Sequence, residues 1–370
     1  MRPISTLRAT AGLSLLAIAL SSAAVSAQSP SPSVRDIPIE GSASHMRLSP
    51  DGTTVALFED AALLDFQVDP ARLPIQMVDL ITGLESTTFD GFDDYTADAA
   101  FSPDGTRLVS KHFNGELLVW DLSGAHDDPL VARIKTSSLG GGKIAFLPDG
   151  RTVALLRAGT PSWIELIDID SGTVTSVIGP APDTYAELLE QTRSGPAFDL
   201  QFATMEVSPD GTLIATSTLS DEVELWLLDT GESRTLRPPS EQFGRINIRQ
   251  LAFSSGSESL TWFDASDGRT YAWDVASGEE IGSLALGGTP FAFSPEGTQL
   301  AWAERREDQT AIGIGDMYGS IAPFDLAVVD GRPSPGLSSI AYTPDGGTIV
   351  LGGLFAPEGE NAIHLIPAPW

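Results

Sequence analysis

The densest group of carboxylates in the chain is Asp90, Asp93, Asp94 and Asp98. Clustered carboxylate oxygens are typical ligands of hard cations, but no D-x-D-x-D-G calcium loop surrounds them. The group therefore fits a weak cation site or, more simply, a solvated loop. The four histidines stand apart, without the i, i+4 or hairpin spacing that metal sites use. No metal or other cofactor is predicted.

The sequence also lacks the usual motifs of nucleophilic and phosphate chemistry. Serines are frequent, yet none lies in a G-x-S-x-G elbow. The glycine-rich run Leu139–Gly142 has no following lysine, so it does not match a phosphate-binding loop. His45 and His364 fall on predicted strands as packed or hydrogen-bonded residues, whereas His112 falls in a predicted loop and His126 follows a strand. No catalytic residue is predicted.

The elements that would position any site repeat along the chain, and Ala99–Gly124 shows the repeat best. It predicts strands at Ala99–Phe101, Thr106–Lys111 and Glu116–Leu122, with the first two joined by a Ser-Pro-Asp-Gly turn. The third strand contains four successive apolar residues, which indicates burial on both faces. Antiparallel strands are buried in this way when sheets stack on both sides, as propeller blades do.

The turn motif recurs seven times, and a short apolar strand precedes each copy. The copies begin at Ser49, Ser102, Leu147, Ser208, Ser254 (a degenerate copy), Ser294 and Thr343. A third strand and an outer strand follow most copies, so each repeat predicts four strands. The last repeat lacks an outer strand, and Asp36–Gly41 precedes the first repeat as an unassigned strand. The sequence therefore predicts an all-β, seven-bladed propeller, closed by Asp36–Gly41 joining the last blade.

The Ser-Pro-Asp-Gly turns and two Trp-Asp dipeptides resemble the WD-repeat β-propeller family across residues 36–370. The residues that carry this resemblance, as structural motif positions, are Trp120, Asp121, Trp226, Trp273 and Asp274. After Trp226, Leu227 stands where the family has aspartate, and the Gly-His dipeptide typical of the family is missing. The resemblance implies a weakened hydrogen-bond network within the blades but the same fold.

The first 27 residues match a cleaved signal peptide, with Arg2 and Arg8 before an apolar run and Val25-Ser26-Ala27 before the cut. Residues 28–35 form a predicted disordered leader, and a single propeller domain follows. Export to the periplasm or the medium is expected. The chain has no cysteine and a formal charge of −29. This charge disfavours nucleic acid and acidic membranes as partners. The sequence has no second apolar segment that would predict insertion of the mature protein into a membrane.

Long predicted loops on one face of the propeller provide candidate partner-binding residues. They span Glu59–Leu73, Asp90–Asp98, Gly179–Thr204 (with a predicted helix at Asp183–Gln191) and Pro238–Asn247. Aromatic side chains on loops are typical interface anchors. The candidates on these and the shorter loops are Phe92, Asp93, Tyr95, Phe113, Trp163, Tyr185, Phe243 and Arg245, and Phe92 also fits a position tucked under its own loop.

Three functional hypotheses follow. The leading one is a non-catalytic exported scaffold that binds a protein or peptide through its loop face. An exported hydrolase or lyase with its site at the channel mouth is the alternative, with Asp93, His112 or Asp221 as its titratable groups. A third hypothesis is an envelope propeller similar to those of the Tol system or of surface layers. The oligomeric state is open.

Overall fold

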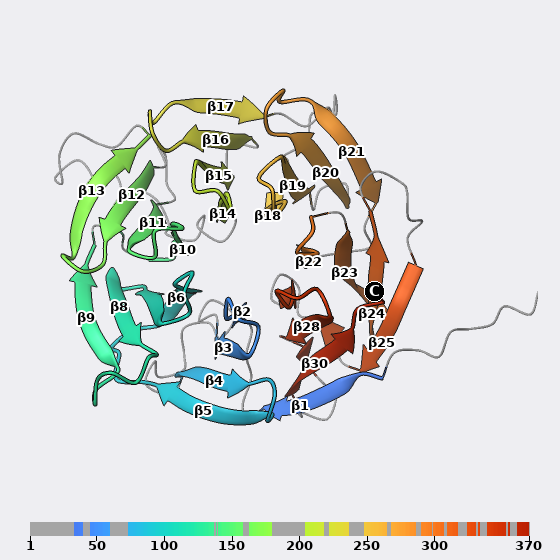
Figure 1. The fold of residues 1–370 in the computed structure, drawn as a ribbon, viewed down its shortest axis with the longest axis horizontal. Helices are drawn as coiled ribbons and strands as arrows, with labels where there is room; N and C mark the ends of the chain where they lie inside the picture. The colour runs from blue at the N-terminus through green and yellow to red at the C-terminus, as the bar shows by residue number, and fades with distance from the viewer. Residues whose placement is uncertain are drawn as a thin grey trace, which may run out of the picture. The chain divides into compact units, whose positions relative to one another are not determined.

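A computed structural model describes the greater part of the chain after residue 32. The described residues are 33–39, 45–59, 73–136, 138, 140–157, 163–179, 204–217, 222–236, 248–264, 268–285, 290–297, 299–306, 309–316, 324–330, 332–333, 339–352, 354–355 and 361–369. In the compact unit Pro32–Trp370, seven four-stranded antiparallel sheets form the blades of a ring (Figure 1). The predicted seven-bladed β-propeller is confirmed.

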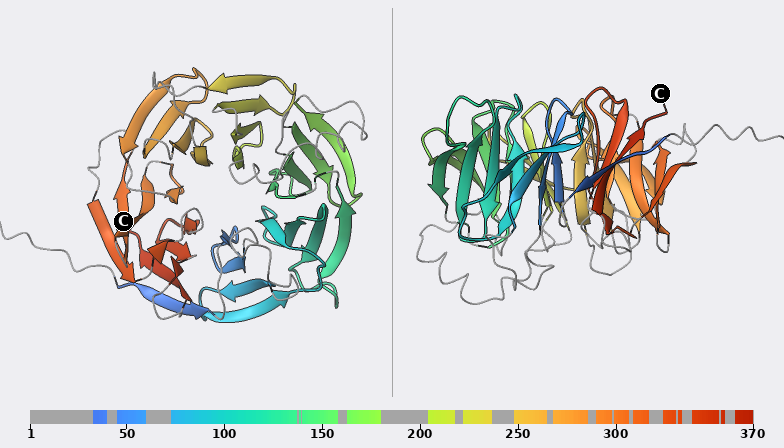
Figure 2. Two further views of the ribbon diagram at one scale, coloured as in Figure 1. Left: turned by 180° about the vertical axis from the view of Figure 1, so that it is seen from behind. Right: turned by 90° about the horizontal axis from the view of Figure 1, so that it is seen from below.

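Each blade runs from an inner strand at the ring axis to an outer strand at the rim (Figures 1 and 2). Blades one to three are β2 (His45–Leu48), β3 (Thr54–Phe58), β4 (Ile75–Asp79), β5 (Leu84–Phe89); β6 (Thr96–Phe101), β7 (Arg107–His112), β8 (Glu116–Asp121), β9 (Leu130–Lys135); and β10 (Lys143–Phe146), β11 (Thr152–Arg157), β12 (Trp163–Asp168), β13 (Thr173–Ile178).

The remaining blades follow the same order, and a small extra sheet joins β26 (Arg332–Pro333) to β29 (Leu354–Phe355). Blades four to seven are β14 (Thr204–Val207), β15 (Leu213–Ser217), β16 (Val223–Leu227), β17 (Ser233–Leu236); β18 (Ile248–Phe253), β19 (Ser259–Asp264), β20 (Arg269–Asp274), β21 (Glu280–Ala285); β22 (Phe291–Phe293), β23 (Leu300–Arg306), β24 (Gln309–Gly315), β25 (Phe324–Asp330); and β27 (Ser339–Tyr342), β28 (Thr348–Gly352), β30 (Asn361–Pro367), β1 (Arg35–Ile39).

The seven turn motifs share one backbone conformation. In each, the amide of the fourth residue donates to the carbonyl of the first, as Gly105 does to Ser102 at 2.8 Å. The fourth residue has positive φ, which glycine adopts without strain. The degenerate copy keeps the conformation with Ser257 at φ 61°, and its Oγ accepts a hydrogen bond from the Asp210 amide of the preceding blade at 3.1 Å.

The hydrophobic core lies between blades rather than in one central mass. Among the described residues, the buried apolar side chains form seven clusters, one at each interface between neighbouring blades. The predicted two-sided burial of the third strand is confirmed in β8. Leu118 and Trp120 pack towards blade one, and Leu117 and Val119 pack towards blade three.

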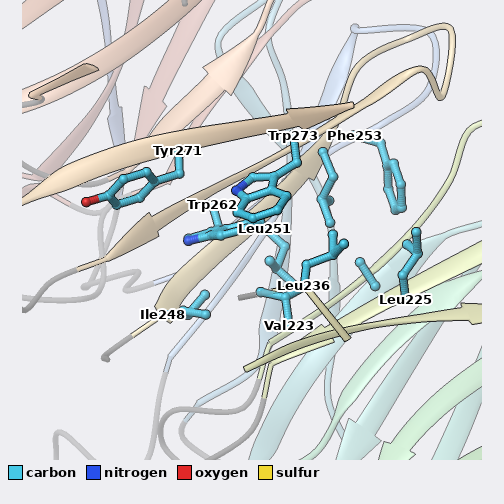
Figure 3. Packing of buried hydrophobic residues seen from close by; sticks show 11 residues of the cluster. Val223, Leu225, Leu236, Ile248, Leu251, Phe253, Trp262, Tyr271 and Trp273 are labelled. Carbon is cyan, nitrogen blue, oxygen red and sulfur yellow. The ribbon is translucent and has the colours of Figure 1, made fainter. Parts of the chain in front are cut away.

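Figure 3 shows the interface between blades four and five. Val223, Leu225 and Leu236 of blade four meet a layer of large side chains from blade five. Within that layer the rings of Trp262 and Trp273 stack with centroids 5.2 Å apart. Burial of side chains this large stabilises the interface by about 1.5–3 kcal/mol for each residue.

The N-terminal strand closes the ring, as predicted. β1 pairs antiparallel with β30 and places Asp36 opposite His364, whose Nδ1 lies 2.8 Å from the Asp36 carboxylate. Arg35 reaches into blade one, where its guanidinium donates to the carbonyls of Leu80 and Ile81. β1 therefore bonds to the last blade and contacts the first. The observed strand is Arg35–Ile39, and the predicted residues 40–41 lie outside the described residues.

The direction of the strands gives the ring two distinct faces. Inner strands run towards the turn motifs and third strands run the same way, so the turn motifs share one face with the tight turns after the third strands. We call this the turn face. The connections from second to third strands, and from each outer strand to the next inner strand, border the opposite face, which we call the loop face. Among the described residues, no helix of the length and apolar character needed to span a bilayer occurs.

Candidate functional site

Four residues of blade two form a small surface on the loop face, which we call the blade-two patch: Asp93, Asp94, Tyr95 and Phe113. The rings of Tyr95 and Phe113 make an edge-to-face pair with centroids 6.5 Å apart. Both side chains are partly exposed, and Asp93 is exposed. The Asp94 carboxylate accepts a hydrogen bond from the amide of Tyr95 at 2.8 Å. The patch therefore combines aromatic area with negative charge.

Backbone hydrogen bonds hold the segments of this patch together. The amide of Phe113 donates to the carbonyl of Tyr95 at 3.0 Å, and the amide of Gly140 donates to the carbonyl of Phe113 at 2.7 Å. Beneath them, the buried Lys111 ammonium donates to the carbonyls of His112 and Gly140. Burial lowers the pKa of Lys111 to about 7. Three connections are thus fixed relative to one another.

A chain of buried side-chain hydrogen bonds supports the patch from below. Trp120 Nε1 donates to Ser110 Oγ at 3.0 Å, and this hydroxyl lies 2.9 Å from His112 Nε2. The carbonyl of Asp94 can only accept, so the proton of the neutral imidazole is on Nδ1, and Nε2 accepts a hydrogen bond from the Ser110 hydroxyl. Burial lowers the pKa of His112 to about 4, which keeps the ring neutral.

This network joins β7 and β8 to the connection that precedes β6. His112 enters from the end of β7 rather than from the predicted loop, so its predicted loop position is wrong. In blade four, Trp226 Nε1 donates to Thr216 Oγ1 at 3.0 Å in the same way. In blade five the corresponding position is Trp262, which has no hydroxyl, and Trp273 Nε1 has no hydrogen-bond partner among the described residues.

The other predicted partner-binding residues divide between buried positions and segments outside the described residues. Phe92 is 3% exposed and packs on the ring of His112. Trp163 begins β12, is 4% exposed and lies under the Arg157 guanidinium. Tyr185, Phe243 and Arg245 lie outside the described residues, as do Asp221 and the predicted helix Asp183–Gln191. The structure thus brings together Asp93, Tyr95 and Phe113.

A second group of residues, from the inner strands, lines the ring axis, and sequence analysis did not identify it as a site. The side chains two positions before each turn motif are all partly exposed, whereas those three positions before it are all buried. Since side chains alternate along a strand, the first set faces a solvent-accessible axis. We call this set the alanine layer: Arg47, Ala100, Ala145, Glu206, Ala252, Ala292 and Ala341. The residues four positions before each motif are polar in every blade except the sixth, and we call them the polar layer: His45, Asp98, Lys143, Thr204, Gln250, Pro290 and Ser339.

Asp98 was expected in the carboxylate-rich loop, and this expectation is wrong. Asp98 belongs to β6, is 1% exposed and pairs with the Arg47 guanidinium at 2.6 Å. Its second oxygen accepts a hydrogen bond from the amide of Ile144 in blade three. Burial alone would raise the pKa of Asp98, but Arg47, Lys143 and this amide lower it below its usual value. Asp98 therefore joins three blades instead of binding a solvated cation.

Two further axial residues carry shifted pKa values. Burial, with Lys143 and Arg47 nearby, lowers the pKa of His45 to about 3, and its ring stacks on Phe58. Burial raises the pKa of Glu206 to about 7, against the smaller opposing effect of Arg47. Among the described residues, no group of three histidine or acidic side chains is arranged to hold a metal ion.

The sequence matches no known protein-family model, and none of the curated proteins matches it. The function is therefore argued from the geometry of this chain.

Proposed function

We propose that this propeller is an exported, WD-repeat-like binding protein that holds a protein or peptide segment against its loop face, with the blade-two patch as an anchor point. One observation carries the proposal: the edge-to-face pair of Tyr95 and Phe113 is partly exposed on backbone that is fixed from below. Aromatic side chains that are already ordered lose little conformational entropy on binding, which favours affinity.

The charge around the pair indicates the chemistry of the partner. Asp93 and Asp94 directly precede Tyr95, and the whole chain carries a formal charge of −29. Complementary potentials speed association and disfavour partners of like charge. The proposed partner is therefore a segment with lysine or arginine next to an apolar side chain. The N-terminal sequence, with its signal-like pattern, supports a location outside the cytoplasm.

A displayed library of random peptides, selected on the purified protein, tests this proposal. Enriched peptides should be basic and apolar, and the Tyr95→Ala/Phe113→Ala double variant should bind them at least about tenfold more weakly, because it loses the anchor. The matched control is Ile81→Ala/Leu84→Ala, which removes two apolar side chains that are 69% and 67% exposed near the turn face. Equal binding to both double variants, or no enrichment on a folded protein, would refute the proposal.

A further inference from the structure

The outer strand of each blade is a sheet edge, and the outer strand of blade three differs from the other six. A sheet edge offers unpaired N–H and C=O groups to any other strand, and charged residues on the edge oppose such pairing. β13 (Thr173–Ile178) has the sequence TVTSVI, without a charged residue or proline. Each of the other six outer strands carries at least one charged residue: Arg35 in β1, Glu85 in β5, Arg133 in β9, Arg234 in β17, Glu280 in β21 and Asp325 in β25.

The edge formed by β13 also exposes apolar side chains. Five of its six residues are exposed, and they include Val174 at 49% and Val177 at 45%. Among the described side chains, no other outer strand has more than one exposed large apolar residue. β13 pairs with β12 and with no other described strand. Unpaired backbone and apolar area together favour the addition of another strand at this edge.

A β-bulge determines how the side chains of β13 are arranged. Thr175 has no opposite residue in β12, and its Oγ1 donates to a carbonyl of that strand at 3.1 Å. Val174 lies opposite Ile167, and Val177 lies opposite Glu165. Because Ile167 and Glu165 are two positions apart in β12, they share a face of the sheet. The bulge therefore places Val174 and Val177 on one face, although they are three positions apart.

The bulge also indicates which strand fits this edge. A regular strand would lose register at the extra residue, whereas a second β13 carries the same extra residue. In an antiparallel pair with a twofold axis between Thr175 and Ser176, Val174 lies opposite Val177 of the second copy. Thr175 then lies opposite Ser176 of the second copy, so that apolar side chains meet apolar ones and hydroxyls meet hydroxyls. Cross-strand pairs of these kinds stabilise antiparallel sheets.

We infer that the protein forms a twofold-symmetric dimer in which two antiparallel β13 strands join the third blades of both copies into one sheet. This pairing uses the free edge of both copies, so it closes at the dimer. β13 lies at the rim of the ring (Figures 1 and 2), and the blade-two patch lies on the loop face. Because the paired strands are antiparallel, the loop faces of the two copies point in opposite directions, and both patches stay accessible.

Analytical ultracentrifugation of the purified protein over a concentration series tests the inference. We expect a dissociation constant of about 1–100 µM, because a single pair of short strands buries less area than a standard interface. The affinity should rise with salt, since two chains that each carry a formal charge of −29 repel each other. A protein that stays monomeric at about five times the upper value would overturn the inference. A dimer that salt weakens would overturn it too, because ion pairs would then hold the copies together.

Two substitutions to lysine separate β13 from the rest of the rim. Val177→Lys gives β13 a charge like those of the other outer strands, and it should weaken the dimer about tenfold or more. Val131→Lys is the matched control, because Val131 is 41% exposed on β9 and the change in net charge is the same. The control should dimerise as the wild type does. Equal weakening by both substitutions, or no weakening by Val177→Lys, would overturn the inference.

Cysteine substitutions report the register, since the chain has no cysteine of its own. Opposite residues of an antiparallel pair have Cβ atoms about 4.5–5.5 Å apart, close to the spacing that a disulfide spans. A mixture of Val174→Cys and Val177→Cys chains should therefore form a disulfide-linked dimer on mild oxidation. Either variant alone should form about tenfold less of it. Equal linkage in all three samples, or none in the mixture, would refute the assigned pairing.

The dimer is independent of the proposed binding at the loop face. The Tyr95→Ala/Phe113→Ala variant should dimerise as the wild type does, because neither residue belongs to β13. Val177→Lys should conversely leave the affinity for the selected peptides unchanged. Loss of the dimer in the Tyr95→Ala/Phe113→Ala variant would assign the contact to the loop face and would overturn the inference.

Discussion

Gly52 of the first turn motif lies against Pro344 of the last, so that a Cβ on Gly52 would be 2.5 Å from Pro344 Cδ. The same relationship links Gly211 to Pro148 in neighbouring blades, at 2.8 Å. The turns therefore contact one another around the turn face, in addition to closing their own hairpins. Glycine at the fourth position serves both the positive φ and this close approach.

Gly52→Ala should lower the free energy of unfolding by about 2–4 kcal/mol, because the left-handed backbone strain adds to the clash with Pro344. Gly124→Ala is the matched control. Gly124 has φ +73°, but nothing lies within 4 Å of its Cβ position, so only about 1–2 kcal/mol should be lost. Urea unfolding of both variants measures the difference. Equal losses would show that the contact between the turns contributes nothing.

Ser110→Ala should destabilise the protein by about 1–3 kcal/mol, since it leaves Trp120 Nε1 and His112 Nε2 buried without their common partner. Ser110→Thr is the control, because Thr216 makes the same bond to Trp226 in blade four. Thermal unfolding compares the two. In the wild type, NMR titration should show His112 neutral until the pH approaches about 4. A protonated imidazole at pH 6 would contradict the assigned network.

Acid should destabilise the propeller through the aspartates of its turn motifs. The Asp104 carboxylate accepts hydrogen bonds from Ser102 Oγ and from the amide and hydroxyl of Thr106, and these bonds lower its pKa. Hydrogen bonds also lower the pKa values of the corresponding aspartates in four other turn motifs, which are Asp51, Asp149, Asp210 and Asp345.

A lowered folded pKa means that the unfolded chain binds the proton more tightly, so stability is complete above about pH 4 and falls as the pH decreases below it. Unfolding free energies measured from pH 7 to pH 2 should show this loss. Asp104→Asn should reduce its steepness, whereas Asp93→Asn at the exposed patch is the control. A flat profile would contradict the prediction.

Glu206 should act on stability in the opposite direction. Its folded pKa of about 7 lies above the usual value, so the folded protein favours the protonated carboxyl. The resulting cost is absent below about pH 4, grows as the pH rises towards 7 and is constant above it. Glu206→Gln should therefore be more stable than the wild type by about 1–3 kcal/mol at pH 8 and should match it at pH 4. A difference that does not vary with pH would exclude Glu206 as its source.

The repeated parts of the fold were predictable because they depend on local residues. The turn motif determines each hairpin, and the apolar run in β8 determines burial on two faces. Closure of the ring by β1 was predictable because the last repeat lacks an outer strand and one unassigned strand precedes the first repeat. Thr96–Asp98 at the start of β6 was missed, since a segment with two polar residues resembles a loop until its partners in other blades are known.

The candidate site was only partly predictable for the same reason. Arg47 and Asp98 are 51 positions apart, and their pairing depends on how blades one and two are placed in the ring. Tyr95 is partly exposed whereas Phe92 is buried, and this difference likewise depends on packing beneath the loop. One signal was present in the sequence. Aligning the seven inner strands on their turn motifs gives alanine five times at one position and a charged residue twice, at Arg47 and Glu206.

The pairing of β1 with β30 determines when the ring can close during biosynthesis. The last blade takes strands from both ends of the domain, so ribosomal synthesis must reach β30 before the ring can lock. The apolar cluster of Ile37 and Met46 is complete only when Ile363 of β30 joins it. A force applied to the chain ahead of Arg35 would peel the β1 pairs one after another, starting at Arg35 and Leu365. The β1–β30 seam is therefore both the place where the ring closes and the place where such a force acts first.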